Sequence, residues 1–225
     1  MCGRFALHGG REQLLEQFAL DSLPPGLAPR YNIAPSQDVL IVRAGAHPGR
    51  RRAALMRWGL VPAWSREPRT KYSMINVRAE TVAEKPAFRQ PFRQRRCLIP
   101  ANGFFEWQET AGAKQPWYVH LRDDELLAFA GLWEHWQDRA GPGLDSCTII
   151  VTQPNELVRR LHDRMPVILA PENYERWLDP ARQDPDGLLP LLRPYPAKRM
   201  EAHRVGRAVN NPANEGPELI RAPEE

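Results

Sequence analysis

The residue with the most distinctive chemistry is a cysteine directly after the initiator methionine, Cys2. Methionine is commonly trimmed before a small residue, and Cys2 would then carry an α-amine and a thiol on adjacent carbons. Unperturbed pKa values are about 7.7–8.0 for such an amine and about 8.5 for the thiol, so both reactive forms are accessible near neutral pH. The pair can condense with an aldehyde through an imine that the thiol closes into a thiazolidine. The alternative is a small apolar residue that starts a strand, because free cysteines are mostly buried and inert.

Three further polar residues are candidates for proton transfer or positioning. Glu106 stands among aromatic residues, where desolvation would raise its pKa and suit a general acid or base. It could instead be the solvent-facing residue of an edge strand. His162 follows a helical pattern and could move protons, or it could be an ordinary surface or core histidine. Asn76 precedes a predicted short helix, where asparagine commonly serves as a cap or turn residue.

Arginine and tryptophan residues indicate a possible nucleic-acid surface. Only 4 of the 31 basic residues are lysine, which leaves 31 − 4 = 27 arginines, and arginine suits bidentate phosphate contacts. A codon bias toward arginine would explain this equally well, and the net charge of +4 is too small to prove such a partner. Guanidinium and indole groups together are typical of single-strand binding surfaces, and the candidates are Arg4, Arg78, Arg95, Arg96, Trp58, Trp64 and Trp107.

The cysteine pattern and the hydropathy indicate a compartment and exclude two classes of protein. Cys2, Cys97 and Cys147 are odd in number, are far apart and form no CxxC pair, so neither a structural zinc site nor a disulfide framework is expected. There is no apolar segment of a signal peptide and no apolar run long enough to span a membrane. We therefore expect an intracellular, cytoplasmic protein, associated with the nucleoid if bacterial, which binds no membrane.

Short apolar segments between turn residues predict the elements that would position these side chains. The 23 prolines favour many loops and few long helices. Strands are predicted at 39–42, 53–58, 95–100, 104–107, 117–121, 126–133, 147–152, 166–169 and 202–205, and helices at 11–20, 86–92, 155–161 and 171–178. Asn102-Gly103 predicts a hairpin turn, and the tail from residue 208 reads as loop. We expect one α+β domain over 1–225 (core about 2–219), with curved antiparallel β-sheets, a barrel-like core and short peripheral helices.

Six motifs in a fixed order resemble the SOS-response-associated peptidase (SRAP) family, the abasic-site shielding proteins. They are MCGRF at 1–5, YNIAP at 31–35, WGLVPAW at 58–64, INVRAET at 75–81, GFFEW at 103–107 and HDRMPV at 162–167, and the resemblance covers the chain to about residue 219. It implies a protein that binds single-stranded DNA and links itself to an abasic-site aldehyde through a thiazolidine, in the DNA damage response. It also implies self-removal of Met1 rather than general proteolysis, with possible lyase activity.

The resemblance also implies roles for individual residues. Cys2 matches the nucleophile, Asn76 the residue that positions its amine, Glu106 the acid/base for imine formation and ring opening, and His162 the proton carrier at the ribose oxygen. By similarity, the DNA-contacting residues are Arg4 and Arg78 at the phosphates and Asn32, Pro35, Trp64, Trp107 and Thr152 along the DNA channel. Some members have a second tryptophan where this chain has Ser65, so the base-separating wedge is expected to be weaker or supplied elsewhere. No cofactor or metal is required, the protein is expected to be a monomer, and replication-fork proteins are candidate partners.

Two other functions fit the same residues. A cysteine peptidase would use Cys2, His162 and Glu106 as nucleophile, base and orienting group. A non-covalent single-stranded DNA-binding module would use the arginines and tryptophans alone, with salt-sensitive binding and no preference for abasic DNA. Turnover of added peptides would identify the peptidase, and a stable adduct with abasic DNA would identify the covalent reaction.

Overall fold

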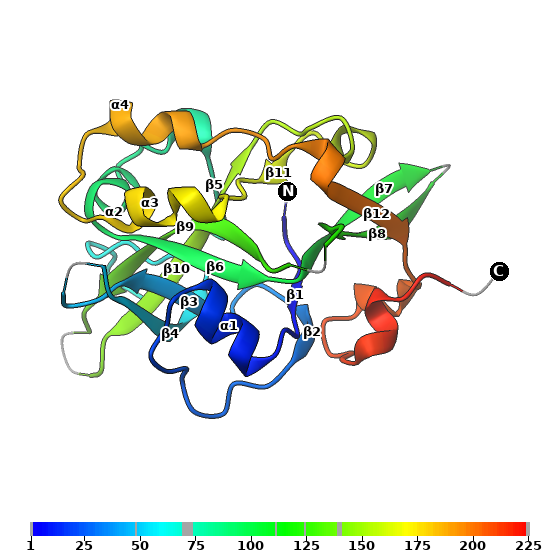
Figure 1. Cartoon of the computed structure of the whole chain (residues 1–225), viewed down its shortest axis with the longest axis horizontal. Coiled ribbons are helices and arrows are strands. Elements are labelled where there is room, and N and C mark those ends of the chain that lie inside the picture. Colours follow the sequence, from blue (N-terminus) through cyan, green and yellow to red (C-terminus); the bar gives the residue numbers. More distant parts are fainter. Residues whose placement is uncertain are drawn as a thin grey trace.

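Two β-sheets built from strands distant in the sequence form the centre of the molecule (Figure 1). The computed structural model describes residues 2–47, 49–68, 74–110, 112–123, 125–138 and 141–223, apart from the side chain of Thr110. The larger sheet contains β11 (Met165–Pro166), β10 (Leu144–Thr152), β4 (Arg51–Trp58), β3 (Asp38–Ala44), β6 (Arg96–Ala101) and β9 (Leu127–Trp136) in that order, and β5 (Asn76–Arg78) pairs with β10. Since β9 also pairs with β10, the strands from β10 to β9 close into a barrel.

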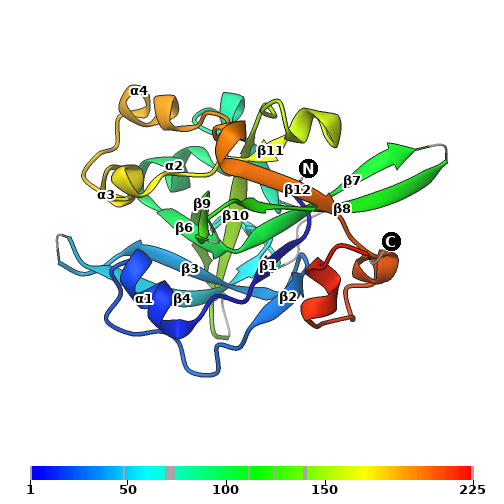
Figure 2. The same ribbon diagram turned by 45° about the vertical axis from the view of Figure 1, so that its right-hand side comes forward.

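The smaller sheet carries the start of the described chain. Its strand order is β12 (Met200–Arg204), β8 (Ala113–Leu121), β7 (Gly103–Thr110), β1 (Phe5–Leu7) and β2 (Arg30–Ile33). Phe5 lies opposite both Phe104 on β7 and Ile33 on β2, so β1 is held on both sides. Figure 2 shows the β7–β8 hairpin extending away from the barrel, with β12 along its side. Residues 5–7, close to the start of the described chain, are therefore part of a sheet.

Burial explains why these segments form strands. Every residue of β6 is buried, and β9 is buried along nearly its whole length, as expected for strands that face the core on both sides. The helices are short, from four to seven residues each. They are α1 (Arg11–Gln17), α2 (Arg89–Gln94), α3 (Tyr174–Leu178) and α4 (Pro185–Leu188), with 3-10 turns η1 (Ala79–Thr81), η2 (Val158–Arg160), η3 (Pro171–Asn173), η4 (Leu189–Leu191), η5 (Ala197–Arg199), η6 (Arg207–Asn210) and η7 (Pro217–Ile220). The predicted α+β class with barrel-like sheets and short peripheral helices is confirmed.

The predicted hairpin turn at Asn102-Gly103 is wrong. At this point the chain passes from β6 in the larger sheet to β7 in the smaller one. Asn102 Oδ1 accepts the backbone N–H groups of His8 and Gly9 at 2.7 and 2.9 Å, so the asparagine joins the crossing to the segment after β1. A Cβ on Gly103 would lie 2.5 Å from the Tyr118 ring, which makes this glycine necessary for close approach of β7 and β8.

Three other expectations need correction. The sheets are not purely antiparallel, because β10 runs parallel to β4 and β5. The predicted helices at 11–20 and 155–161 are shorter, ending at Gln17 and reduced to the turn η2, respectively. The tail from residue 208 is not a simple loop, because it contains η6 and η7, which bury Val209 and Leu219. These two apolar residues stand singly among polar residues, so the sequence showed no periodic pattern there.

Candidate functional site

Cys2 lies in the interior at the start of the smaller sheet. Its side chain is fully buried, and its carbonyl oxygen accepts a hydrogen bond of 2.7 Å from Asn76 Nδ2. Two residues later, the Arg4 carbonyl accepts the Phe105 N–H at 2.9 Å, which extends the pairing of β1 with β7 toward Cys2. Burial raises the pKa of the Cys2 thiol well above its ordinary value, and the charge of Glu106 acts in the same direction. The thiol is therefore protonated in this environment and needs a base to become a nucleophile.

Asn76 begins β5, where it lies opposite Ile149 on β10. Its amide nitrogen holds Cys2, whereas its Oδ1 is buried and accepts no hydrogen bond from the described residues. An unsatisfied buried acceptor costs about 1–3 kcal/mol. The amide therefore has one acceptor position next to Cys2 available for another donor.

Glu106 is 2% exposed on β7, within the aromatic stretch that suggested desolvation. Burial raises its pKa to about 7, and the charge of Asp163 acts in the same direction. A carboxyl group with this pKa is partly protonated at neutral pH and can either donate or accept a proton. The interpretation as a solvent-facing edge residue is wrong, since the side chain is buried.

His162 follows η2, and a hydrogen bond between η2 and β7 joins this segment to the strand that carries Glu106. Gln108 lies two residues beyond Glu106 on β7, hence on the same face, and its Nε2 donates to the Arg160 carbonyl at 3.0 Å. His162 Nδ1 accepts the Arg164 N–H at 3.0 Å and lies 2.8 Å from Asp163 Oδ1. Burial lowers the pKa of His162, while the Asp163 charge opposes that shift.

Arg4 and Trp107, both predicted to contact DNA, lie together. The Arg4 guanidinium is 5.7 Å from the centre of the Trp107 ring, and Trp107 Nε1 donates to Asn210 Oδ1 at 2.7 Å. Arg4 Nη1 donates to Asn32 Oδ1 at 2.7 Å and to the Val209 carbonyl at 2.8 Å. The C-terminal segment thus orients two candidate DNA-contacting side chains.

Two other residues predicted along the DNA channel are buried and engaged within the protein. Asn32 is fully buried, and its Nδ2 donates to the carbonyls of Asn211 and Asn214 at 3.0 and 2.9 Å. Thr152 is 5% exposed, and its Oγ1 donates to the Leu192 carbonyl at 3.2 Å. In this structure both side chains support their surroundings rather than form a surface.

The remaining candidates divide into exposed and buried residues. Arg78 is exposed at the end of β5, two residues after Asn76, while Trp64 is 68% exposed and Pro35 partly exposed. No hydrogen bond or ring contact among the described residues joins Trp64 or Pro35 to the group around Cys2. The Ser65 carbonyl accepts Trp136 Nε1 at 2.8 Å, which fixes the loop beside Trp64.

Arg95, Arg96 and Trp58 do not belong to a basic, aromatic surface. Trp58 is fully buried and Arg96 is 3% exposed. Arg96 donates to carbonyl groups in and after α2 and α3, including Phe92 at 2.7 Å, and Arg95 pairs with Glu134 at 2.8 Å. Arg96 thus holds the helices on β6, and Arg95 joins the end of α2 to β9. Composition alone could not distinguish these contacts from a binding role.

Sequence reasoning missed Asp163 and the segment around Val209. Asp163 directly follows His162, so its position in the motif was the available signal for its charge near Glu106. The segment gave little signal, because its contact with Arg4 is made by a backbone carbonyl. Within the described ranges, no three histidine, cysteine or acidic side chains are grouped to hold a metal ion. No helix in those ranges is long and apolar enough to cross a membrane.

The chain belongs to the SOS response associated peptidase (SRAP) family, whose model matches residues 1–212. It is 48% identical to the abasic site processing protein YoqW of Bacillus subtilis (strain 168), over 99% of this chain and 100% of that protein. It is 33% identical to the abasic site processing protein HMCES of Gallus gallus, over 85% of this chain and 66% of that protein.

Solved structures share the fold. A protein from Bacteroides thetaiotaomicron matches with a TM-score of 0.87 at 24% identity, covering 99% of this chain and 100% of that one. A protein from Bordetella bronchiseptica matches with a TM-score of 0.80 at 27% identity, covering 91% and 100%. The fold is therefore shared with solved structures at 24% and 27% sequence identity.

Proposed function

We propose that this protein processes abasic sites in single-stranded DNA during the DNA damage response, by forming a covalent thiazolidine between Cys2 and the ring-opened sugar. The observation that carries the proposal is the 2.7 Å hydrogen bond from Asn76 to the Cys2 carbonyl beside buried Glu106. It fixes the backbone of the residue whose amine and thiol must both react. The names of the relatives, abasic site processing proteins, support the same substrate.

The reaction begins with hydrolysis of the Met1–Cys2 peptide bond, which consumes one water and frees the Cys2 amine. We propose that this amine donates to Asn76 Oδ1, the buried acceptor that the described residues leave unused. The amine attacks the sugar aldehyde, and protonated Glu106 donates to the departing hydroxyl, so water leaves and an imine forms. A pKa of about 7 allows this carboxyl group to serve as the acid near neutral pH.

Ring closure completes the crosslink. Loss of water leaves Glu106 ionised and the imine nitrogen protonated. The Cys2 thiol then gives its proton to Glu106, and the sulfur attacks the imine carbon to give a neutral thiazolidine whose nitrogen keeps its proton. No oxidant or cofactor enters this balance. His162, neutral because burial lowers its pKa, moves a proton at the ribose oxygen during ring opening and during reversal.

DNA binding in this proposal uses phosphate and stacking contacts and not base-edge recognition at the lesion. Arg78 is exposed beside Asn76, and Arg4 is held over Trp107. Covalent capture then supplies the specificity for abasic sites that these contacts lack. A general cysteine peptidase would use the same buried thiol, and turnover of added peptides distinguishes it from covalent capture of DNA.

The test combines Met1-trimmed protein, verified by intact mass, with a single-stranded oligonucleotide that contains one abasic site. We expect a heat-stable band on a denaturing gel and a mass equal to protein plus DNA minus one water. Cys2→Ala should abolish the band, while Cys147→Ala, which removes a buried thiol elsewhere, should retain it. A trimmed, folded protein that forms no adduct would disprove the proposal, and rapid turnover of added peptides would favour the peptidase.

A further inference from the structure

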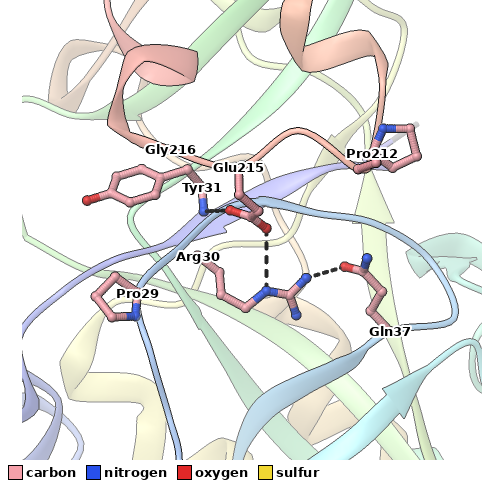
Figure 3. A pocket seen from close by; sticks show the side chains of 8 residues that line it. Pro29, Arg30, Tyr31, Gln37, Pro212, Glu215 and Gly216 are labelled. Carbon is pink, nitrogen blue, oxygen red and sulfur yellow. Dashed lines mark hydrogen bonds and ion pairs between the residues drawn. The ribbon is translucent and has the colours of Figure 1, made fainter.

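An open cavity of about 580 Å³ lies between β2 and the segment before η7, separate from Cys2 (Figure 3). Pro29 and Pro212 lie on opposite sides of it, and the side chains of Arg30, Gln37 and Glu215 meet between them. The cavity is large enough for one planar ring system. Its walls are apolar, and its polar groups are gathered in one place.

The polar groups of the cavity hold each other in position but retain hydrogen-bonding capacity. Glu215 Oε2 accepts the Tyr31 N–H at 2.8 Å, and Oε1 is 3.5 Å from Arg30 Nε. Gln37 Oε1 accepts from Ala34 N at 3.0 Å and from Arg30 Nη2. No described residue accepts from Gln37 Nε2. Each carboxylate oxygen of Glu215 still has a lone pair available, so a carboxylate acceptor and an amide donor remain for a ligand.

The segment that forms one wall also contacts the proposed DNA-binding residues. Val209 binds Arg4, Asn210 binds Trp107, and Glu215 binds Tyr31 and Arg30. Glu215 lies six positions after Val209, which bounds their distance to about 20 Å. A strand held over Arg4 and Trp107 can therefore reach the cavity within a few nucleotides.

We propose that this cavity binds one unpaired guanine base of the strand held at Cys2, an inference that rests on the proposed function. Guanine presents two adjacent donors, N1–H and N2–H, beside the acceptor O6. The Glu215 carboxylate takes the two donors, and Gln37 Nε2 donates to O6. The other bases lack this order of two donors and one acceptor. Reading an unstacked base on its Watson–Crick edge requires single-stranded DNA, which matches the proposed substrate.

The experiment uses thymine oligonucleotides with one abasic site and a single guanine placed one to three nucleotides away on either side. Adduct formation is followed on denaturing gels, and anisotropy measures affinity for matched strands without the lesion. We expect guanine at one position to raise affinity about fivefold to tenfold over thymine. Inosine, which lacks the N2 amino group, should lose the gain, and 7-deazaguanine, which keeps the Watson–Crick edge, should retain it.

Two protein variants test the assigned groups. Glu215→Gln keeps an oxygen for the Tyr31 N–H but replaces half of the acceptor pair, and Gln37→Glu keeps the bonds to Ala34 and Arg30 but removes the donor. Both should lose the guanine preference while keeping affinity for all-thymine strands within about twofold. Glu172→Gln makes the same charge change as Glu215→Gln at an exposed site outside the cavity; it is the matched control for that variant and should keep the preference.

The outcomes separate this proposal from the proposed function. Normal adduct formation with less than twofold guanine preference at all six positions overturns the guanine site and leaves the function intact. Guanine preference in anisotropy without any adduct overturns the covalent function and supports the site. A preference that persists in both cavity variants also overturns the assignment to this cavity.

Discussion

Replacing Glu106 by glutamine should make the protein more stable at alkaline pH while slowing the reaction. Glu106 has an ordinary pKa of 4.5 that burial raises to about 7. A shift of about 2.5 pKa units corresponds to about 3.4 kcal/mol at 1.36 kcal/mol per unit. This is the free energy by which burial disfavours the ionised carboxylate in the native protein. Glutamine has nearly the same shape and carries no charge at any pH.

The sign of the pH dependence follows from proton binding. Between pH 4.5 and about 7 the native protein holds a proton on Glu106 that the unfolded chain has lost, so wild-type stability falls as pH rises through this window. Of the total, about 2.5 kcal/mol should be lost between pH 5 and pH 8. The variant lacks this contribution, and titration of all other groups largely cancels in the difference between the two proteins.

Urea unfolding of both proteins at pH 5 and pH 8 measures this difference, with the N-terminal residue of each checked by mass. The variant should gain about 2.5 kcal/mol relative to wild type between the two pH values, and its adduct formation should slow about 100-fold or more, since a positioned acid or base contributes about 10²–10⁴ in rate. Binding to undamaged strands should stay near normal. Parallel pH profiles for the two proteins would refute the raised pKa, and equal loss of adduct formation and of binding would make Glu106 structural.

Two further substitutions test the DNA-binding surface and its support. Arg78→Ala should weaken binding to single strands of any sequence and reduce the slope of log affinity against log salt by about one, measured by anisotropy at several salt concentrations; an unchanged slope would exclude a phosphate contact. Asn32→Ala should leave the carbonyls of Asn211 and Asn214 and the Arg4 guanidinium without their buried partner, at about 1–3 kcal/mol in urea unfolding. It should also expose the C-terminal segment to protease, and resistance equal to wild type would show that Asn32 does not anchor this segment.

Candidate site residues could be predicted from the sequence where their immediate neighbours or their motif indicated a role. Glu106 stands between aromatic residues, so its desolvation was readable, and the order of six motifs indicated the family. Their roles in the reaction remain predictions. The many short predicted strands indicated the fold class, although strands as short as β1 or β5 have little signal of their own.

The parts that could not be predicted depend on contacts between distant segments. A barrel closes through pairing of β9 with β10, which is not visible in the pattern of either strand. Asn102-Gly103 has the composition of a hairpin turn, but the chain crosses between the two sheets here. The Asn102 side chain binds the segment after β1, and Gly103 allows β7 to lie close to the Tyr118 ring. Asn32 resembles a surface residue by type, yet its partners are backbone carbonyls about 180 residues away. Because every residue has a backbone carbonyl, sequence motifs cannot predict which carbonyls Asn32 binds.

A reaction that uses the first residue of a chain has to overcome the disorder that is usual at termini. Here β1 is paired on both sides, and Asn76 binds the carbonyl of Cys2 from a strand of the other sheet. In the proposed reaction, the amine freed from Met1 would thus lie on a residue whose carbonyl is already held. Glu106 is buried where its charge acts on Cys2, and this burial both destabilises the ionised carboxylate and gives it a pKa suited to proton transfer. Stability and reactivity are therefore linked at one side chain, which is why a single substitution should move them in opposite directions.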